Sequence, residues 1–278
     1  MEFKFKKFTV QQAHSAMRVN TDGVLLGAWM RLPQVLVDLS QDKTARMLDV
    51  GTGTGVIALM AAQRVSQIQN GRITVVINAL EIDLESYKEA VKNFANSPWG
   101  SGTGSITLKA EYHSLQQYAL VIAPTLLANN KYDLIFSNPP YFIDSLKSPV
   151  EAKSNARHTT TLSQSEIIRY STMLLKVEGT LAIVLPADEG EQFLCKINFL
   201  LAAACNNKLD FNPVLVPVRL CKVRTTANKM PKRYLIEFKL TVAINPLPVC
   251  VEEELIIMEN GNYTLQYKEL TCNFYLNF

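Results

Sequence analysis

The sequence has little of what builds disulfide frameworks, metal centres or membrane anchors. Its five cysteines are an odd number, none of them stands in a C-x-x-C pair, and only three histidines occur in 278 residues. This usage is typical of reduced thiols in a cytosolic protein and argues against a zinc site. No apolar run is long enough to span a bilayer, and residues 1–7 lack the apolar stretch of a signal peptide. We therefore expect a cytoplasmic protein with no membrane segment and no bound metal.

The commonest nucleotide-binding signatures are missing too, although a glycine-rich turn is present. Residues 45–50 form an apolar strand that runs into Gly51, Gly53 and Gly55, and a helical run follows directly. The spacing is not G-x-G-x-x-G and no Lys-Ser/Thr pair follows, so neither a dinucleotide fingerprint nor a P-loop is matched. Glycine allows positive φ and lets the backbone approach a ligand closely. The strand, turn and helix therefore predict a site for a nucleotide-type cofactor.

Two acids stand at the ends of neighbouring strands in this region. Asp49 directly precedes the glycines, and Glu81 ends the next strand, 73–80. A carboxylate in the first position would repel a pyrophosphate but suits a cationic ligand such as S-adenosylmethionine, which carries an ammonium and a sulfonium. An acid in the second position accepts hydrogen bonds from ribose hydroxyls in doubly wound folds. The alternative is that both are ordinary surface acids at strand ends.

A short motif follows another apolar strand, 132–136: Asn138, Pro139, Pro140 and Tyr141. Each proline fixes its own φ and lacks an N–H, so the carbonyl groups are held in place with few local donors. The side-chain oxygen of Asn138 and the carbonyl oxygen of Pro139 can accept both hydrogens of one planar amino group, while Tyr141 stacks on the ring that bears it. The motif predicts a clamp for a conjugated amine, either the N6 amine of adenine or a side-chain amide. The alternative is a strand that ends in a proline-rich turn.

Strands and helices alternate along the chain, which predicts a mostly parallel sheet with helices on both faces. Seven strands are expected, at residues 45–50, 73–80, 106–110, 132–136, 179–186, 214–223 and 234–242. Helices are expected at 56–62, 84–96, 114–128, 163–177 and 188–205. The spacing Ser163-x-x-Glu166 predicts a capping box at the start of the fourth helix. We assign one domain, 1–245, with an N-terminal appendage, 1–30, and a C-terminal extension, 246–278, packed on it.

The chain resembles the class I S-adenosylmethionine-dependent methyltransferases of the amino-methylating type, which have a Rossmann-like α/β fold. The glycine turn and the Asn-Pro-Pro-Tyr motif carry this wider likeness. Other segments resemble, more narrowly, the bacterial valine-tRNA adenine-N6 methyltransferases that modify tRNA nucleotide 37: residues 3–8, 16–29, 97–99, 156–162 and 263–276. The likeness spans nearly the whole chain, and the run 16–29 and the Arg-His-Thr-Thr-Thr segment make it specific.

The resemblance implies S-adenosylmethionine as the cofactor, surrounded by Thr21, Asp22, Asp49, Gly51, Gly53, Gly55, Glu81, Asp83 and Glu111. Asp49 and the glycines would line its methionine end, and Glu81 would hold its ribose. Thr21 and Asp22 would close the site from the N-terminal side, although Asn20-Thr21-Asp22 is also a good helix N-cap. The family usually has a small acid after the third strand to meet the adenine amine. Here we prefer Glu111 over His113, and the alternative is an exposed strand-end acid.

For catalysis the resemblance implies Asn138, Pro139, Pro140 and Tyr141, which would orient the amine of a flipped-out adenosine for attack on the methyl group. Tyr141 and Phe142 would replace the stacking that the base loses. No strong base is demanded, because the methylated cation is acidic enough to lose its proton to water.

A net charge of only +3 is a weak signal for nucleic-acid binding, so the distribution of the basic residues matters more. Contacts with tRNA are expected where basic residues cluster. Residues 211–236 contain six bases and no acid. The candidates are Lys229, Lys232 and Arg233 there, Lys147, Lys153, Arg157 and His158 after the clamp, and Lys4, Lys6, Lys7 and Arg18 near the start. The alternatives are solvated charged faces and, for Arg157, a structural ion pair.

Other functions remain open at this point. A ribosomal-RNA amine methyltransferase is the closer alternative. A protein-glutamine N5-methyltransferase could use the same clamp but usually carries a separate N-terminal helical domain. A non-catalytic RNA-binding protein fits less well, because both motifs are intact. We predict methyl transfer to the N6 amine of adenosine 37 of a valine tRNA, with a monomer favoured.

Overall fold

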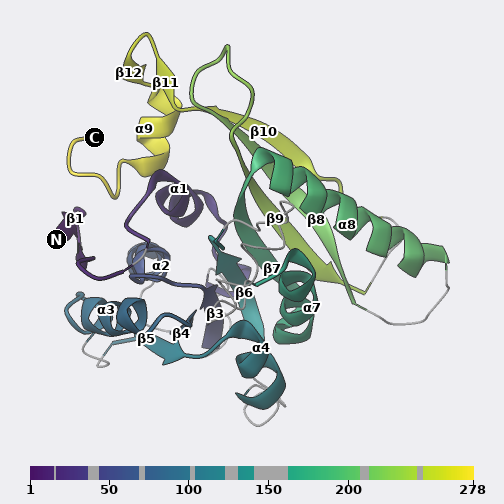
Figure 1. Cartoon of the computed structure of the whole chain (residues 1–278), viewed down its shortest axis with the longest axis horizontal. Helices are drawn as coiled ribbons and strands as arrows, with labels where there is room; N and C mark the ends of the chain where they lie inside the picture. Colours follow the sequence, from purple (N-terminus) through teal and green to yellow (C-terminus); the bar gives the residue numbers. More distant parts are fainter. Residues whose placement is uncertain are drawn as a thin grey trace, which may run out of the picture.

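The computed structural model describes residues 1–15, 17–36, 44–68, 73–100, 104–122, 131–140, 162–206, 213–242 and 247–278. Its centre is an eight-stranded sheet in the order β10-β8-β9-β7-β6-β3-β4-β5 (Figure 1). These strands are β3 Thr44–Val50, β4 Thr74–Glu81, β5 Ile106–Tyr112, β6 Tyr132–Ser137, β7 Leu175–Pro186, β8 Val214–Arg224, β9 Arg233–Thr241 and β10 Val251–Ile256. From β7 to β5 the strands pair in parallel, whereas β9 is antiparallel to both β7 and β8. The predicted class, a mostly parallel Rossmann-like sheet, is confirmed.

The sheet has one strand more than the seven predicted. The extra strand, β10, pairs in parallel with β8 at the sheet edge. Three consecutive glutamates made it a poor candidate, because glutamate is depleted in strands. In the structure Lys222 and Arg224 of β8 pair with Glu252 and Glu254 of β10, at 2.6 Å and 2.9 Å. Opposite charges on neighbouring strands thus support a segment that has weak strand propensity of its own.

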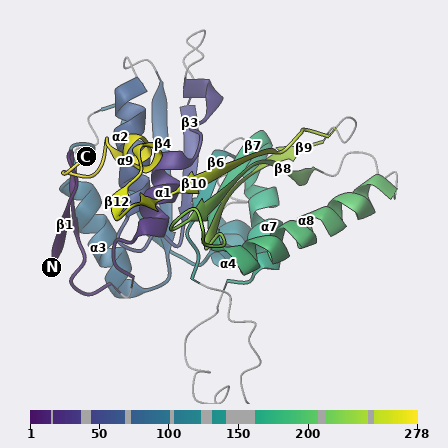
Figure 2. The ribbon, with the colours of Figure 1, turned by 90° about the horizontal axis from the view of Figure 1, so that it is seen from above.

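Helices cover both faces of the sheet (Figure 2). One hydrophobic core includes residues of α1 Thr21–Trp29, α2 Val56–Ile68, α3 Leu84–Ala95 and α9 Leu265–Thr271, together with the 3-10 turn Gln34–Leu36. The other includes residues of α4 Leu115–Gln117, the π-turn Tyr118–Ile122, α7 Gln164–Leu174 and α8 Ala187–Asn206. Successive strand residues supply opposite cores, as with Met47 and Leu48, because side chains alternate across a pleated strand.

The boundaries of three predicted helices differ from expectation, and the first of them, α2, continues to Ile68 instead of ending at residue 62. The capping box at Ser163 is present, with the Glu166 amide donating to the Ser163 hydroxyl at 3.2 Å and the Ser163 amide donating to the Glu166 carboxylate at 2.8 Å. However, α7 ends at Leu174, and β7 begins at the next residue, because Leu175 pairs with Tyr132 of β6. The helix predicted over 114–128 is helical only over 115–122 among the described residues.

Segments from both ends of the chain lie near α1 (Figure 1). They are the hairpin β1 Glu2–Lys4 and β2 Thr9–Gln11, the hairpin β11 Met258–Glu259 and β12 Asn262–Tyr263, and α9. The Lys6 amide donates to the Phe274 carbonyl at 2.9 Å, and the Lys6 ammonium donates to the Cys272 carbonyl at 2.6 Å. Residues 23–29 of α1 are all buried, so the predicted appendage 1–30 contains a core helix. Within the described ranges, no helix has the length and apolar character needed to cross a bilayer.

Candidate functional site

The ends of β3 and β6 lie side by side in the middle of the sheet. Val50 and Ser137, the last residues of the two strands, are partners in the parallel register. The Ser137 hydroxyl donates to the Val50 carbonyl at 2.8 Å and is buried. Gly51 and Asn138 follow directly, so the glycine turn and the Asn-Pro-Pro-Tyr motif leave neighbouring strand ends. Ligands of open α/β sheets bind at such carboxyl ends, where the connections diverge.

The glycine turn is tied to the end of β4 through Glu81. The Gly53 amide donates to one oxygen of the Glu81 carboxylate at 2.8 Å. The amides of Ile82 and Asp83 donate to the other oxygen, at 2.8 Å and 2.9 Å. Gly53 has φ of 57°, and Gly55 has φ of 86° and lies against Phe94, where a Cβ would sit 2.5 Å from the ring. Glycine is required at these two positions by the backbone conformation, and at Gly55 also by space.

Asp49 is a fully buried carboxylate behind the turn. Its Oδ2 accepts a hydrogen bond from the Thr52 hydroxyl at 2.6 Å, and its Oδ1 has no hydrogen-bond partner in the part of the chain that the structure describes. Burial raises the pKa of Asp49 to about 7, and hydrogen bonding from the Thr52 hydroxyl and the Ala58 backbone opposes this rise only in part. A buried carboxylate with one unsatisfied oxygen is costly to keep charged. Such a group is poised to accept a cationic partner.

The first turn of α1 lies between the two motifs. Asn20 caps this helix by accepting from the Gly23 amide at 2.9 Å, as its sequence indicated. A Cβ on Gly23 would lie 3.7 Å from the Asn138 amide nitrogen and 3.7 Å from a side-chain carbon of Ile57, on the helix that follows the glycines. The Asn138 amide nitrogen is also 4.0 Å from the Met17 sulfur. The segment before α1 therefore reaches the proposed clamp.

Two residues that were predicted to have different roles form an ion pair with each other. The Arg233 guanidinium, expected to contact RNA, donates to the carboxylate of Asp22, expected to border the cofactor, at 2.7 Å. Both side chains are half-buried. The pair ties α1 to the start of β9 and so holds the helix beside Asn138. Thr21 is exposed next to it, and Asp83 caps α3 by accepting from the Ser86 amide at 2.8 Å.

The acid-free basic segment is largely neutralised by β10. Besides the Lys222 and Arg224 pairs, Arg219 pairs with Glu253 at 2.8 Å and stacks over the Trp29 ring at 4.1 Å. Sequence proximity could not reveal these acids, which are about 30 residues away. Lys229 and Lys232, in the connection between β8 and β9, are exposed.

Glu111 does not join the other predicted cofactor residues. It is the register partner of Leu80, whose side chain lies in the second core, whereas Asp49 pairs with Ala79 and Phe136 of the first core. Its carboxylate accepts from Asn78 at 2.7 Å and pairs with Lys109 at 3.3 Å. The pleat places Glu111 on the opposite face of the sheet from Asp49.

Several residues at this edge were not identified from sequence. Ile82 follows Glu81 in the sequence, and Tyr112, the last residue of β5, is the register partner of Glu81. Each of these two side chains is 48% exposed. The sequence did offer a signal for Ile82, because an apolar residue there directly follows the acid at the end of the strand. Glu89 of α3 accepts from the backbone amides of His14 and Ser15 at 2.8 Å and 3.1 Å, and nothing local in the sequence indicated this role. The predicted residues Tyr141, Phe142, Arg157 and His158 lie outside the described residues, as do Lys147 and Lys153.

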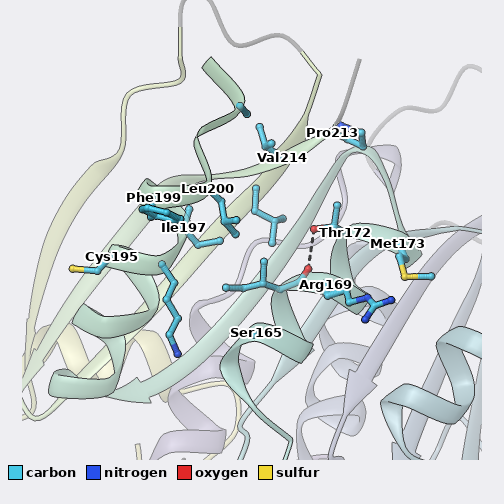
Figure 3. A pocket seen from close by; sticks show the side chains of 14 residues that line it. Ser165, Arg169, Thr172, Met173, Cys195, Ile197, Phe199, Leu200, Pro213 and Val214 are labelled. Carbon is cyan, nitrogen blue, oxygen red and sulfur yellow. Dashed lines mark hydrogen bonds between the residues drawn. The ribbon is translucent and has the colours of Figure 1, made fainter. Parts of the chain in front are cut away.

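A separate cavity of about 930 Å³ lies between α7, α8 and the start of β8 (Figure 3). It is mostly apolar, with Phe199, Leu200 and Met173 at its surface. None of the predicted site residues that the structure describes lines it. No group of three or more metal-ligating side chains occurs in the described ranges either.

Comparisons with known proteins place this geometry in context. No family model matches the chain. It is 38% identical to the tRNA1(Val) (adenine(37)-N6)-methyltransferase of Parabacteroides distasonis over 274 residues, covering 99% of this chain and 97% of the relative. It is 36% identical to the protein of the same name from Trichodesmium erythraeum over 277 residues, covering 100% and 98%.

Solved structures show the same fold at low identity. A protein from Agrobacterium tumefaciens described as an O-methyltransferase matches with a TM-score of 0.58 at 15% identity, covering 91% of this chain and 96% of its own. A protein from Listeria monocytogenes described as a class I S-adenosylmethionine-dependent methyltransferase matches with a TM-score of 0.55 at 15% identity, covering 94% and 70%.

Proposed function

We propose a function from one premise: this chain belongs to the family of tRNA1(Val) (adenine(37)-N6)-methyltransferases. The proposed reaction is transfer of a methyl group from S-adenosylmethionine to the N6 amine of adenosine 37 in a valine tRNA. The observation that carries it is the pairing of Val50 with Ser137, which sets the glycine turn beside Asn138. Methyl transfer between two bound molecules needs a cofactor-binding site and an amine-binding site that lie directly next to each other.

The residues present fit this cofactor. The unsatisfied Oδ1 of Asp49 offers a negative partner to a cationic ligand. A Cβ on Gly51 or Gly53 would meet no atom of the described residues within 4 Å, so these residues leave room for a ligand against the backbone. We assign Asp49, Gly51 and Gly53 to its methionine end. The Glu81 oxygens accept three backbone hydrogen bonds, and a carboxylate offers about four acceptor sites, which leaves capacity for a ribose hydroxyl.

The other predicted cofactor residues take supporting parts in this proposal. Thr21 and Asp22 stay at the N-terminal side of the site, with Asp22 positioned by Arg233. Gly55 packs the turn against Phe94, and Asp83 caps α3. We do not carry Glu111 forward as an adenine contact, because it lies on the other face of the sheet.

The chemistry asks the protein for binding and orientation. S-adenosylmethionine supplies a methyl group already activated on its sulfonium. The Asn138 side-chain oxygen and the Pro139 carbonyl accept the two hydrogens of the target amine, which localises the nitrogen lone pair for attack. Pro139 is buried and Pro140 is exposed, so the motif is anchored on one side and open on the other. Correct alignment of two bound reactants lowers the barrier by up to roughly 7–11 kcal/mol.

We further propose that exposed cations hold the tRNA. Lys229 and Lys232 are the candidates in the connection between β8 and β9. Arg157 and His158 are assigned to RNA contact, and Tyr141 and Phe142 to base stacking, on family resemblance. Phosphate contacts of this kind carry much of the affinity for nucleic acids and weaken with salt.

Incubation with labelled S-adenosylmethionine and defined acceptors tests the reaction. The acceptors are an unmodified valine tRNA transcript, the same transcript with guanosine at nucleotide 37, ribosomal subunits and a peptide release factor. We expect label on the first alone and mass spectrometry to place it on N6 of adenosine 37. Label in ribosomal RNA or in protein would overturn the proposal in favour of the corresponding alternative enzyme.

Replacement of the clamp amide tests the assigned chemistry. Asn138→Ala should lower kcat by roughly 10²-fold or more, as loss of one preorganised polar contact does in other enzymes, and leave cofactor affinity unchanged. Single-turnover kinetics and calorimetry separate the two effects. Asn96→Ala, an exposed asparagine at the end of α3, is the matched control. Lost cofactor affinity in Asn138→Ala would contradict the role given to this residue.

A further inference from the structure

A cavity beside the first turn of α1 belongs neither to the glycine turn nor to the clamp. Its volume is about 480 Å³, and its lining comes from the N-terminal hairpin, the start of α1 and the C-terminal extension. Sites for small molecules commonly measure about 300–1,000 Å³. We name it the aromatic pocket, lined among others by Lys4, Thr21, Tyr263, Tyr267, Tyr275 and Phe278.

Aromatic rings form one wall of this pocket. Tyr263 stacks on Tyr267 with ring centroids 5.1 Å apart, and Phe278 stands edge-on to Tyr263 at 5.1 Å and to Tyr275 at 5.4 Å. Tyr263 is nevertheless 44% exposed. A ring that its neighbours hold in place and that stays open to solvent loses little entropy when a planar ligand stacks on it.

The charge around the pocket suits an aromatic base joined to an anion. Among the described residues no lining side chain is acidic, the Phe278 oxygen accepts from the Lys6 ammonium at 2.7 Å, and the Lys4 side chain is 63% exposed. Lys4 does pair with Glu2 at 3.1 Å, but exposed pairs of this kind are weak and exchange readily. A planar stacking surface together with an available cation is the combination that single-stranded nucleic acids use.

The pocket and the proposed clamp share one helical turn. Asn20 and Thr21 line the pocket, and the Cβ position of Gly23 lies 3.7 Å from the Asn138 amide nitrogen. One turn of helix rises about 5.4 Å, and stacked nucleotides are about 3.4 Å apart. The pocket is therefore within reach of a nucleotide one or two positions from an adenosine held at Asn138.

We propose that the aromatic pocket stacks a nucleobase of the tRNA next to the methylated adenosine, with Lys4 near its phosphate. This inference rests on the proposed function, because the second base must belong to the strand that presents the target. Stacking in the pocket offsets part of the free energy that is spent when the adenosine leaves its own stack. The C-terminal extension then takes part in substrate recognition as well as in folding.

The test compares three variants with the wild-type protein. Tyr263→Ala removes the exposed ring, Tyr263→Phe keeps it, and Phe199→Ala removes a 75% exposed ring at the distant cavity of Figure 3. Methyl transfer to the valine tRNA transcript gives KM and kcat, and calorimetry gives the Kd for S-adenosylmethionine as a check of folding. An anticodon stem–loop with 2-aminopurine at nucleotide 36 or 38 reports stacking of each neighbour by fluorescence.

We expect Tyr263→Ala to raise KM for tRNA by roughly fivefold or more, the lower end of what one base stack contributes, with cofactor affinity unchanged. Tyr263→Phe and Phe199→Ala should match the wild type, and fluorescence quenching at one neighbour should be lost only in Tyr263→Ala. An unchanged KM and unchanged quenching in that variant would overturn the aromatic pocket while the proposed function stands. Absence of tRNA methylation by the wild type would overturn the function itself, and this inference with it.

Discussion

The buried carboxylate of Asp49 should make the stability of the ligand-free protein depend on pH in a defined way. Burial raises its pKa from the ordinary value of 3.8 to about 7. Between these values the folded state keeps a proton that the unfolded state has lost. The stabilisation is therefore complete below pH 3.8 and is lost as pH rises through 7. Since each pH unit in this interval is worth about 1.4 kcal/mol, the full effect is about 4 kcal/mol.

Asp49→Asn removes this titration. The amide oxygen can still accept from Thr52, but the amide nitrogen becomes a buried donor without a partner, at a cost of about 1–3 kcal/mol that does not vary with pH. The informative quantity is therefore the slope of the free energy of unfolding against pH. Urea unfolding without cofactor at pH 5 to 8 should show the free energy of unfolding of the variant, minus that of wild type, rising by about 2 kcal/mol between pH 5 and 7, and by a few tenths of a kcal/mol more between pH 7 and 8.

The comparison with wild type isolates Asp49 from other buried acids. Burial also raises the pKa of Glu237, but that residue is present in both proteins, and its contribution cancels in the difference. Two parallel stability curves across this pH range would refute the reasoning. In the wild type, affinity for S-adenosylmethionine should increase as pH rises through 7, because the ionised carboxylate is the form that a cation prefers. The Asp49→Asn variant should bind S-adenosylmethionine weakly at every pH.

Two further predictions concern the framework of the site. Gly55→Ala should destabilise the fold by about 2–4 kcal/mol, because φ at this position is 86° and a Cβ would sit 2.5 Å from Phe94. Gly104→Ala is the control and should not destabilise it, because that glycine has no positive φ and no atom of the described residues within 4 Å of its Cβ position. Urea titration measures the free energy of unfolding of both variants. Glu89→Ala leaves the His14 and Ser15 amides without acceptors and should cost about 1–3 kcal/mol and weaken cofactor binding. Glu85→Ala, an exposed acid on the same helix, should change neither property, and equal effects of the two changes would contradict the role of Glu89.

Features that depend on contiguous residues were determined by the sequence itself. The alternation of strands and helices, the cap at Asn20 and the capping box at Ser163 all follow from local pattern and local hydrogen bonding. The glycine turn and the Asn-Pro-Pro-Tyr motif were recognisable because their chemistry lies within a few consecutive residues. Parallel strands end at the same edge of a sheet, so the proximity of these motifs was also a reasonable expectation.

Only the tertiary structure decided which distant side chains meet. Asp22 and Arg233 are 211 residues apart, and the acids of β10 neutralise a segment that is purely basic in sequence. Glu111 shows the physical reason most clearly. Side chains alternate across a strand, so a shift of one residue in register moves a carboxylate to the opposite face, and composition alone does not determine that register. The aromatic pocket likewise exists only because both ends of the chain pack beside α1.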